Sequence, residues 1–240
     1  MEPYGTDLEV TKLIDNFTAL VVGNSGSGKT QYVIDILKHG HEMMNDPSCL
    51  NNILFYYAED QPLYQEFRKH PMGKRIKWFK ENPTRDEIYE EINNQPFTLV
   101  IIDDYGLHLQ DDLVDIFNVG RNRGNISFIM IIHNLFHEHP IFRNLNRQVK
   151  YLFVYNFPRD KKQYHTLAQQ ITPGNTKWFI EGVEATFQKP FSPSVMDLSG
   201  MLPPIFLLRD TFLPSYKNAM GIYVDANLNI HEEMKRFESL

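Results

Sequence analysis

The sequence predicts an α/β fold in which a mostly parallel central sheet lies between two layers of helices. Three observations lead to this prediction. Five short runs are almost continuously apolar, as strands buried on both faces of a parallel sheet are. Segments with helical periodicity separate these runs, and a glycine-rich loop stands between the first run and the first helical segment. The five expected strands are residues 17–22, 53–57, 98–102, 126–132 and 151–155.

Helical patterns fill most of the intervals between the expected strands. Apolar residues of 33–37 share one face after the glycine-rich loop, and Gly40 is placed to end that helix. Thr84 and Glu87 form a capping box in front of the next helix. The remaining expectations are a short edge strand at 76–79, a helix around 113–117 that Gly120 ends, and helices around 161–171 and 177–187.

The glycine-rich loop matches the pattern G-x-x-x-x-G-K-S/T. Its glycines allow successive backbone N–H groups to curve around an anion at the N-terminus of a helix. Lys29 is then placed to reach the β and γ phosphates of a nucleotide, and the Thr30 hydroxyl to help hold Mg²⁺. We therefore expect ATP and Mg²⁺ to bind at Gly23, Asn24, Ser25, Gly26, Ser27, Gly28, Lys29 and Thr30.

The expected strand 98–102 ends in two carboxylates, Asp103 and Asp104. An apolar strand with this ending has the form of a Walker B motif. In that motif the first acid helps to hold Mg²⁺ and the second orients the attacking water. Strands with acidic ends are common, but one that follows a phosphate-binding loop in the same chain is far more specific. We therefore expect Asp103 in the metal site and Asp104 as a catalytic residue.

These motifs refine the fold prediction to a P-loop NTPase, a three-layer sandwich with a mostly parallel central sheet. From Pro190 the chain becomes rich in proline, serine and glycine, and the alternation of strands and helices fades. We expect a P-loop ATPase domain at 1–189 and an extended or irregular C-terminal extension at 190–240, packed on the same domain.

Composition restricts the setting in which this chain acts. It carries 24 basic and 30 acidic residues, for a net charge of −6, which argues against coating nucleic acid by bulk charge but leaves a local basic loop open. Its single cysteine, Cys49, excludes an internal disulfide framework and fits a reducing compartment. No apolar run approaches the ~20 residues that span a bilayer, and the first residues lack the pattern of a signal peptide. We expect an intracellular protein.

Two further groups of polar residues are candidates for a role in catalysis. His133 and Asn134 end the expected strand 126–132, so either could sense the γ-phosphate. Arg121 and Arg123 lie in a turn between a helix and a strand, hence at the opposite edge of the sheet from their own phosphate loop. They are either a basic turn at a helix end or arginine fingers supplied to a neighbouring subunit.

Five segments carry these motifs in a particular order: residues 21–30, 52–64, 100–104, 120–127 and 133–136. Together they resemble the viral DNA-packaging ATPases of the poxvirus type, within the HerA–FtsK-like branch of P-loop motors. The likeness is greatest to the compact forms carried by large DNA viruses and virus-like transposons. It covers about residues 15–165 well and the C-terminal third weakly.

The resemblance implies a homo-oligomeric ring, a hexamer or pentamer, that hydrolyses ATP. Such a ring drives double-stranded DNA into a preformed capsid, at the site of virion assembly in the host cell, and docks on a capsid or capsid-vertex protein. Lys29, Thr30 and Asp103 match the family's phosphate and metal ligands. Asp104 stands where many such motors have glutamate, and His133 where the sensor is usually glutamine.

Three other functions share the phosphate loop. A P-loop kinase that phosphorylates a small molecule or nucleotide is the strongest of them, but it should offer an arginine-bearing lid, for which Arg143 and Arg147 are weak candidates. A GTPase should carry a guanine-reading Asn-Lys-x-Asp motif, which the sequence lacks. An assembly factor that binds ATP without hydrolysing it fits least well with the acid pair.

Overall fold

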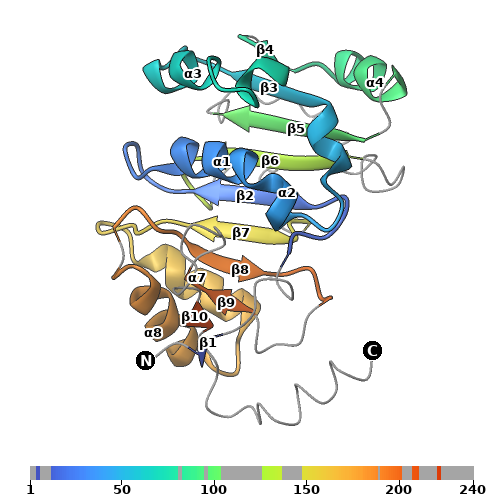
Figure 1. The fold of residues 1–240 in the computed structure, drawn as a ribbon. Helices are drawn as coiled ribbons and strands as arrows, with labels where there is room; N and C mark the ends of the chain where they lie inside the picture. Colours follow the sequence, from blue (N-terminus) through green and yellow to red (C-terminus); the bar gives the residue numbers. More distant parts are fainter. Residues whose placement is uncertain are drawn as a thin grey trace.

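The computed structural model describes residues 4–5, 12–80, 83–94, 97–103, 126–136, 148–188, 190–201, 207–210 and 221–222. Within these ranges the chain forms a ten-stranded sheet with the strand order β1-β10-β9-β8-β7-β2-β6-β5-β3-β4. Figure 1 shows the strands side by side, with β4 at one end of the sheet and β1 at the other. The order divides the sheet into a parallel part, from β7 to β4, and an antiparallel part.

The parallel part contains the predicted apolar runs. Its strands are β2 (Thr18–Val22), β3 (Ile53–Tyr57), β4 (Ile76–Phe79), β5 (Thr98–Asp103), β6 (Ile126–Ile132) and β7 (Tyr151–Val154). Every neighbouring pair among them is parallel, so their carboxyl ends lie at one edge of the sheet. The predicted α/β fold with a mostly parallel central sheet is confirmed.

Helices cover both faces of the parallel strands. α1 (Lys29–Lys38), α2 (Gly40–Met43) and α3 (Pro62–Phe67) share one hydrophobic core with the sheet, and α4 (Arg85–Asn94), α7 (Lys162–Ile171) and α8 (Thr176–Thr186) share the other. Successive residues of one strand alternate between the cores: Leu20 lies in the second and Val21 in the first. Among the described residues, the 3₁₀ turns η2 (Pro47–Asn51) and η3 (Gly73–Arg75) precede β3 and β4. This is the predicted three-layer sandwich.

The helix boundaries test the local predictions. The capping box of α4 is present, because the Thr84 N–H donates to Glu87 Oε2 at 3.1 Å and the Glu87 N–H donates to Thr84 Oγ1 at 3.4 Å. The predicted stop is present, because α1 ends at Lys38 with His39 as its C-cap, but Gly40 is also the first residue of a further helix, α2, which was not predicted. A Cβ at Gly40 would lie 2.6 Å from Leu50 Cδ1, so the glycine allows a close contact with η2. Helix α3 was not predicted, and the helix expected around 113–117 lies outside the described residues.

The antiparallel part of the sheet comes largely from the C-terminal extension. β8 (Ser194–Asp197) pairs with β7 along its whole length, and β9 (Leu208–Arg209), β10 (Gly221–Ile222) and β1 (Tyr4–Gly5) continue outward. The described parts of residues 190–240 therefore extend the central sheet by strand pairing. The N-terminal strand β1 forms the last strand of this part.

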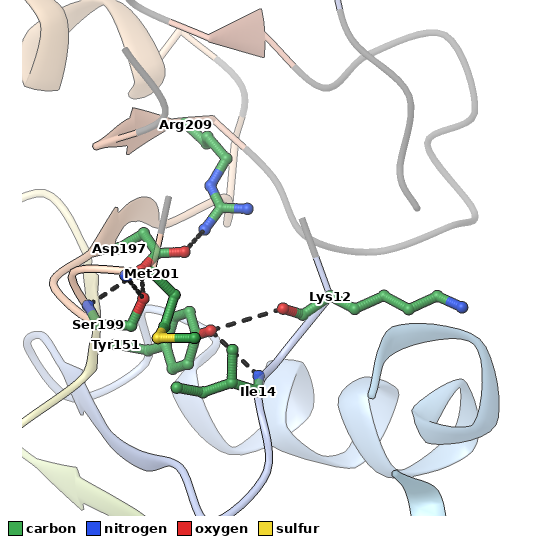
Figure 2. A network of polar contacts seen from close by, with 7 residues as sticks. All are labelled: Lys12, Ile14, Tyr151, Asp197, Ser199, Met201 and Arg209. Carbon is green, nitrogen blue, oxygen red and sulfur yellow. Dashed lines mark hydrogen bonds and ion pairs between the residues drawn. The ribbon is translucent and has the colours of Figure 1, made fainter. Parts of the chain in front are cut away.

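A buried polar network joins the extension to β7 (Figure 2). Arg209 Nη2 lies 2.9 Å from Asp197 Oδ2, and the Ser199 hydroxyl donates to Asp197 Oδ1 at 2.6 Å. Tyr151 faces the N-terminal segment, where its hydroxyl oxygen accepts a bond of 3.1 Å from the Ile14 N–H. Burial, followed by the carboxylate of Asp197, raises the pKa of Tyr151 to about 12, so the hydroxyl stays protonated at neutral pH. Because Asp197 pairs with Tyr151 at the start of β7, the network lies at the amino-terminal edge of the parallel strands.

Candidate functional site

The carboxyl edge of the parallel strands brings the sequence motifs together around one pocket. The glycine-rich loop follows β2, Asp103 ends β5, and His133 follows β6, which lies between the other two strands. Ligands of open parallel sheets bind at this edge. The pocket has a volume of about 250 Å³ and is lined by Ser25, Gly26, Gly28, Lys29, Thr30, Gln31, Gln61, Leu63, Asp103 and His133.

The backbone of the glycine-rich loop needs its glycines for two different reasons. Gly26 and Gly28 have φ angles of 75° and 99°, in the left-handed region that L side chains rarely adopt. Gly23 is needed for space, because a Cβ there would lie 2.6 Å from Tyr155 Cβ. The chain then enters α1 directly at Lys29, and no side chain caps the helix at Gly28. The first-turn N–H groups, which have no acceptor within the helix, therefore belong to residues that line the pocket.

Lys29 is held against the loop that it follows. Its ammonium group donates to the carbonyl oxygens of Gly23 at 2.7 Å and Asn24 at 2.8 Å, and the residue is only 6% exposed. His133 approaches from β6, with its Nδ1 3.5 Å from Lys29 Nζ. A phosphate in the pocket would meet a lysine that is already desolvated and positioned, which strengthens its attraction for the anion.

Thr30 and Asp103 form the part of the site that can hold a metal ion. The Thr30 hydroxyl donates to Asp103 Oδ2 at 2.9 Å, so the two predicted Mg²⁺ ligands are in direct contact. Asp103 is 3% exposed and lines the pocket. Hydroxyl and carboxylate oxygens are the ligands that Mg²⁺ prefers, usually with several waters and substrate phosphates completing its octahedron. The donor set therefore fits Mg²⁺ bound together with a nucleotide.

Tyr64 is a residue of this site that the sequence analysis missed. It lies on α3, is fully buried, and donates its hydroxyl to Asp103 Oδ2 at 2.5 Å. Its ring packs edge-on against Phe55 of β3, with 5.3 Å between centroids, and at a tilt against Trp78 of β4, with 5.7 Å between centroids. The signal for α3 was Pro62, which occupies the first helical position that proline favours. Nothing in the sequence pattern indicates that Tyr64 contacts Asp103.

The other predicted site residues differ in how the structure places them. Of the two sensor candidates, His133 lines the pocket, whereas Asn134 Oδ1 accepts a bond from the Phe136 N–H at 3.1 Å in a local turn. Gln61 also lines the pocket from the loop after β3. Asp104, Arg121 and Arg123 lie outside the described residues, so their roles stay predictions.

The groups described above all suit one ligand, a phosphate chain with the metal ion that accompanies it. Backbone N–H groups at the start of α1 and the ammonium of Lys29 attract a phosphate chain, while Thr30 and Asp103 provide oxygen ligands for the metal ion that accompanies it. All of these groups come from rigid elements, the ends of β2 and β5 and the first turn of α1. The site has the geometry of a P-loop nucleotide-binding site.

Comparisons with known proteins give two similar solved structures, both at low TM-scores. No family model and no curated protein sequence matches this chain. Among the described residues, none of the helices is both long and apolar enough to cross a bilayer. The chain is similar to the crystal structure of a KaiC-like protein from the archaeon Pyrococcus horikoshii OT3, with a TM-score of 0.40 and 14% identity over 58% of this chain and 72% of that one. It is also similar to the flagellar accessory protein FlaH from Methanocaldococcus jannaschii, with a TM-score of 0.39 and 9% identity over 60% of this chain and 74% of that one. At these TM-scores neither likeness carries an argument about this chain.

Proposed function

We propose that this chain is a Mg²⁺-dependent ATPase that works as a homo-oligomeric ring and translocates double-stranded viral DNA into a preformed capsid. One observation supports the ATPase activity in this proposal. Thr30 contacts Asp103 in the same pocket as the buried Lys29, next to the glycine-rich loop. The DNA-translocating part rests on the order of the sequence motifs, which resembles that of poxvirus-type packaging ATPases.

The geometry supports a specific division of work in the site. Lys29 binds the β and γ phosphates after its ammonium leaves the two carbonyl oxygens that now accept from it. Thr30 and Asp103 hold Mg²⁺, which supplies positive charge where the phosphoryl oxygens accumulate negative charge. His133 lies close enough to Lys29 to register whether a γ-phosphate is present. Asp104 orients the attacking water in this proposal.

A ring of subunits would give a role to the two arginines in the sequence segment 120–124. Arg121 or Arg123 from one subunit would reach the phosphates held by Lys29 of the next subunit. An arginine supplied in trans contributes about 10³–10⁵ in rate, because it places a full positive charge beside the transferred phosphoryl group. Within this proposal the ring docks on a capsid or capsid-vertex protein in the infected host cell.

The first experiment measures ATP hydrolysis by the purified protein with and without long double-stranded DNA. Lys29→Ala is the variant that should lose hydrolysis in both conditions. Lys38→Ala is its matched control, because Lys38 ends the same helix with its ammonium 3.1 Å from Asp35 Oδ1, away from the pocket residues. Hydrolysis that DNA stimulates, that Lys29→Ala abolishes and that Lys38→Ala keeps is the expected result.

Other outcomes would separate the alternatives. Strong hydrolysis that is indifferent to DNA would remove the translocation part and favour a P-loop kinase with water as a substitute acceptor. The absence of hydrolysis in every condition, with ATP binding retained, would favour an assembly factor that only binds nucleotide.

A mixing experiment tests the arginines in trans. Whichever of Arg121→Ala and Arg123→Ala loses hydrolysis should regain it when its subunits are combined with Lys29→Ala subunits. If no mixture of the two regains activity, the trans arrangement is wrong.

A further inference from the structure

A second pocket adjoins the phosphate loop on the side away from Asp103. It has a volume of about 210 Å³, and its lining includes three aromatic residues, Tyr155, Phe187 and Phe191, and three polar ones, Ser27, Asn156 and Ser192. Ser27 belongs to the loop itself, whereas Tyr155 and Asn156 directly follow β7. Because β2 lies between β7 and β6 in the sheet, this pocket and the pair Asp103 and His133 lie on opposite sides of the loop.

Phe191 is the most unusual residue of this second pocket. It is 74% exposed, and its φ angle of 57° is in the left-handed region, where a bulky residue is an outlier. Its side chain lies over the loop, since a Cβ built at Gly28 would be 3.5 Å from Phe191 Cβ and 3.6 Å from its Cδ1. The next residue is fixed by a bond of 2.7 Å from the Ser192 hydroxyl to the carbonyl of Asp210. Outliers of this kind persist where the surrounding structure enforces them, often at ligand clamps.

Polar groups at the pocket offer directional bonds. Asn156 is exposed, and its Oδ1 lies 3.4 Å from the Tyr164 hydroxyl, which orients the amide. A side-chain amide presents a donor and an acceptor side by side, a pattern that matches the edge of adenine, where an amino group lies next to a ring nitrogen. Ser27 Oγ is buried and has no hydrogen-bond partner within the described part of the chain. The pocket thus combines aromatic surface with polar groups suited to a flat, heteroaromatic ligand.

We propose that the second pocket binds the base of the nucleotide, and that Phe191 stacks on this base while Asn156 pairs with the adenine edge. The proposal rests on the proposed function, because it places the phosphates of the same nucleotide in the first pocket. With the γ-phosphate at Asp103 and His133, the nucleoside end extends in the opposite direction, toward β7. Gly28 lines the first pocket, and a Cβ built on it would lie 3.5 Å from Phe191 Cβ, so Gly28 stands between the two pockets.

Calorimetric titration with two ligands tests this assignment. ATP with Mg²⁺ fills both pockets, whereas inorganic tripolyphosphate with Mg²⁺ fills only the first. The natural chain should bind ATP at least tenfold more tightly than tripolyphosphate, because stacking on an aromatic ring contributes about this much affinity. Phe191→Ala should weaken ATP about tenfold and leave tripolyphosphate unchanged. Phe97→Ala is the matched control, because Phe97 is also exposed, at 43%, but precedes β5 at the other edge of the sheet.

The ratio of ATP to GTP affinity gives a further test, because a loss of structure would weaken both nucleotides and would not favour GTP. Asn156→Asp replaces the amide by a carboxylate, which only accepts hydrogen bonds. Guanine presents two adjacent donors at its N1 and N2 positions, so this variant should shift the ratio of ATP to GTP affinity toward GTP by about tenfold. Its affinity for tripolyphosphate should match that of the natural chain.

The remaining outcomes separate the base pocket from the proposed function. If the natural chain binds ATP and tripolyphosphate equally tightly, the base pocket is wrong while the phosphate site stands. Equal weakening of both ligands by Phe191→Ala would also overturn the base pocket, because it would mean that Phe191 only supports the loop. If the natural chain binds neither ligand, the proposed function fails, and the base pocket fails with it.

Discussion

Two buried aspartates lie at opposite edges of the same sheet. Asp103 ends β5 at the edge where the phosphate loop lies, and Asp197 ends β8, which runs antiparallel, at the other edge. Both are almost sealed from solvent, with exposed fractions of 3% and 8%. Burial therefore does not distinguish them, although burial of a carboxylate is costly wherever it occurs.

The two carboxylates differ in their surroundings. Asp197 faces the guanidinium of Arg209 at 2.9 Å, so a full positive charge offsets its own. Asp103 accepts hydrogen bonds from the hydroxyls of Thr30 and Tyr64, and it also lines a pocket. The comparison indicates that Asp197 holds the extension in place, whereas Asp103 presents a carboxylate to the pocket where a cation can bind.

The largest expected effect concerns the structural pair. Arg209→Met should lower the free energy of unfolding by about 3–5 kcal/mol, because it leaves the carboxylate of Asp197 buried without its cation. Chemical denaturation measures this loss. The double variant Asp197→Leu with Arg209→Met should recover most of it, since an apolar pair removes the uncompensated charge. A double variant no more stable than Arg209→Met alone would mean that the charge pair is not what holds the extension.

The second effect concerns Asp103 and should appear in activity. Asp103→Asn keeps an oxygen that can accept from Thr30 and Tyr64 but removes the negative charge. We expect ATP hydrolysis to fall by about 10²–10³, with a change in unfolding free energy of at most about 1–2 kcal/mol. Parallel measurement of hydrolysis rate and denaturation midpoint checks both. A large loss of stability with little loss of activity would reverse the roles assigned to the two aspartates.

The sequence predicts the parallel part of the sheet closely, for a physical reason. Strands buried on both faces must be apolar along their whole length, so their pattern is strong and local, and β3 and β6 begin and end at the predicted residues. The phosphate loop is equally local. By contrast, β8 and β9 are short strands in a segment rich in proline and serine, and only pairing with β7 and with each other defines them.

Contacts between distant residues were the part that the sequence could not predict. Tyr64 and Asp103 lie 39 positions apart, and Asp197 and Arg209 pair across two strands with no motif that indicates them. Gly40 shows the same limit: its signal was that of a helix end, and its close packing against Leu50 had none. In each case the physical cause is tertiary packing, which a one-dimensional pattern does not encode.

A smaller effect is expected for Tyr64, which touches Asp103 but does not line the pocket. Tyr64→Phe keeps the aromatic packing with Phe55 and Trp78 and removes one hydroxyl. Groups that orient a metal ligand typically change metal affinity or activity by about 10–100-fold. We expect a decrease of about tenfold at limiting Mg²⁺, with partial recovery at high Mg²⁺. Mg²⁺ titration of the hydrolysis rate measures this, and a decrease that is independent of Mg²⁺ would show that Tyr64 acts through packing alone.

The smallest effect is expected for an exposed polar contact on the opposite face of the sheet. This contact can be compared with the two buried aspartates. Thr84 and Glu87 cap α4 in solvent, so neither group pays the desolvation that makes the two aspartates sensitive to their partners. Thr84→Ala should lower the free energy of unfolding by about 1 kcal/mol, the usual contribution of an N-cap side chain. Hydrolysis should keep its rate and its Mg²⁺ dependence, because α4 packs in the core that faces away from α1 and α3. Denaturation curves and initial rates, measured on one preparation, test this prediction. A loss of activity in this variant would mean that the two faces of the sheet are coupled. The site would then depend on more of the fold than the ends of β2, β5 and β6.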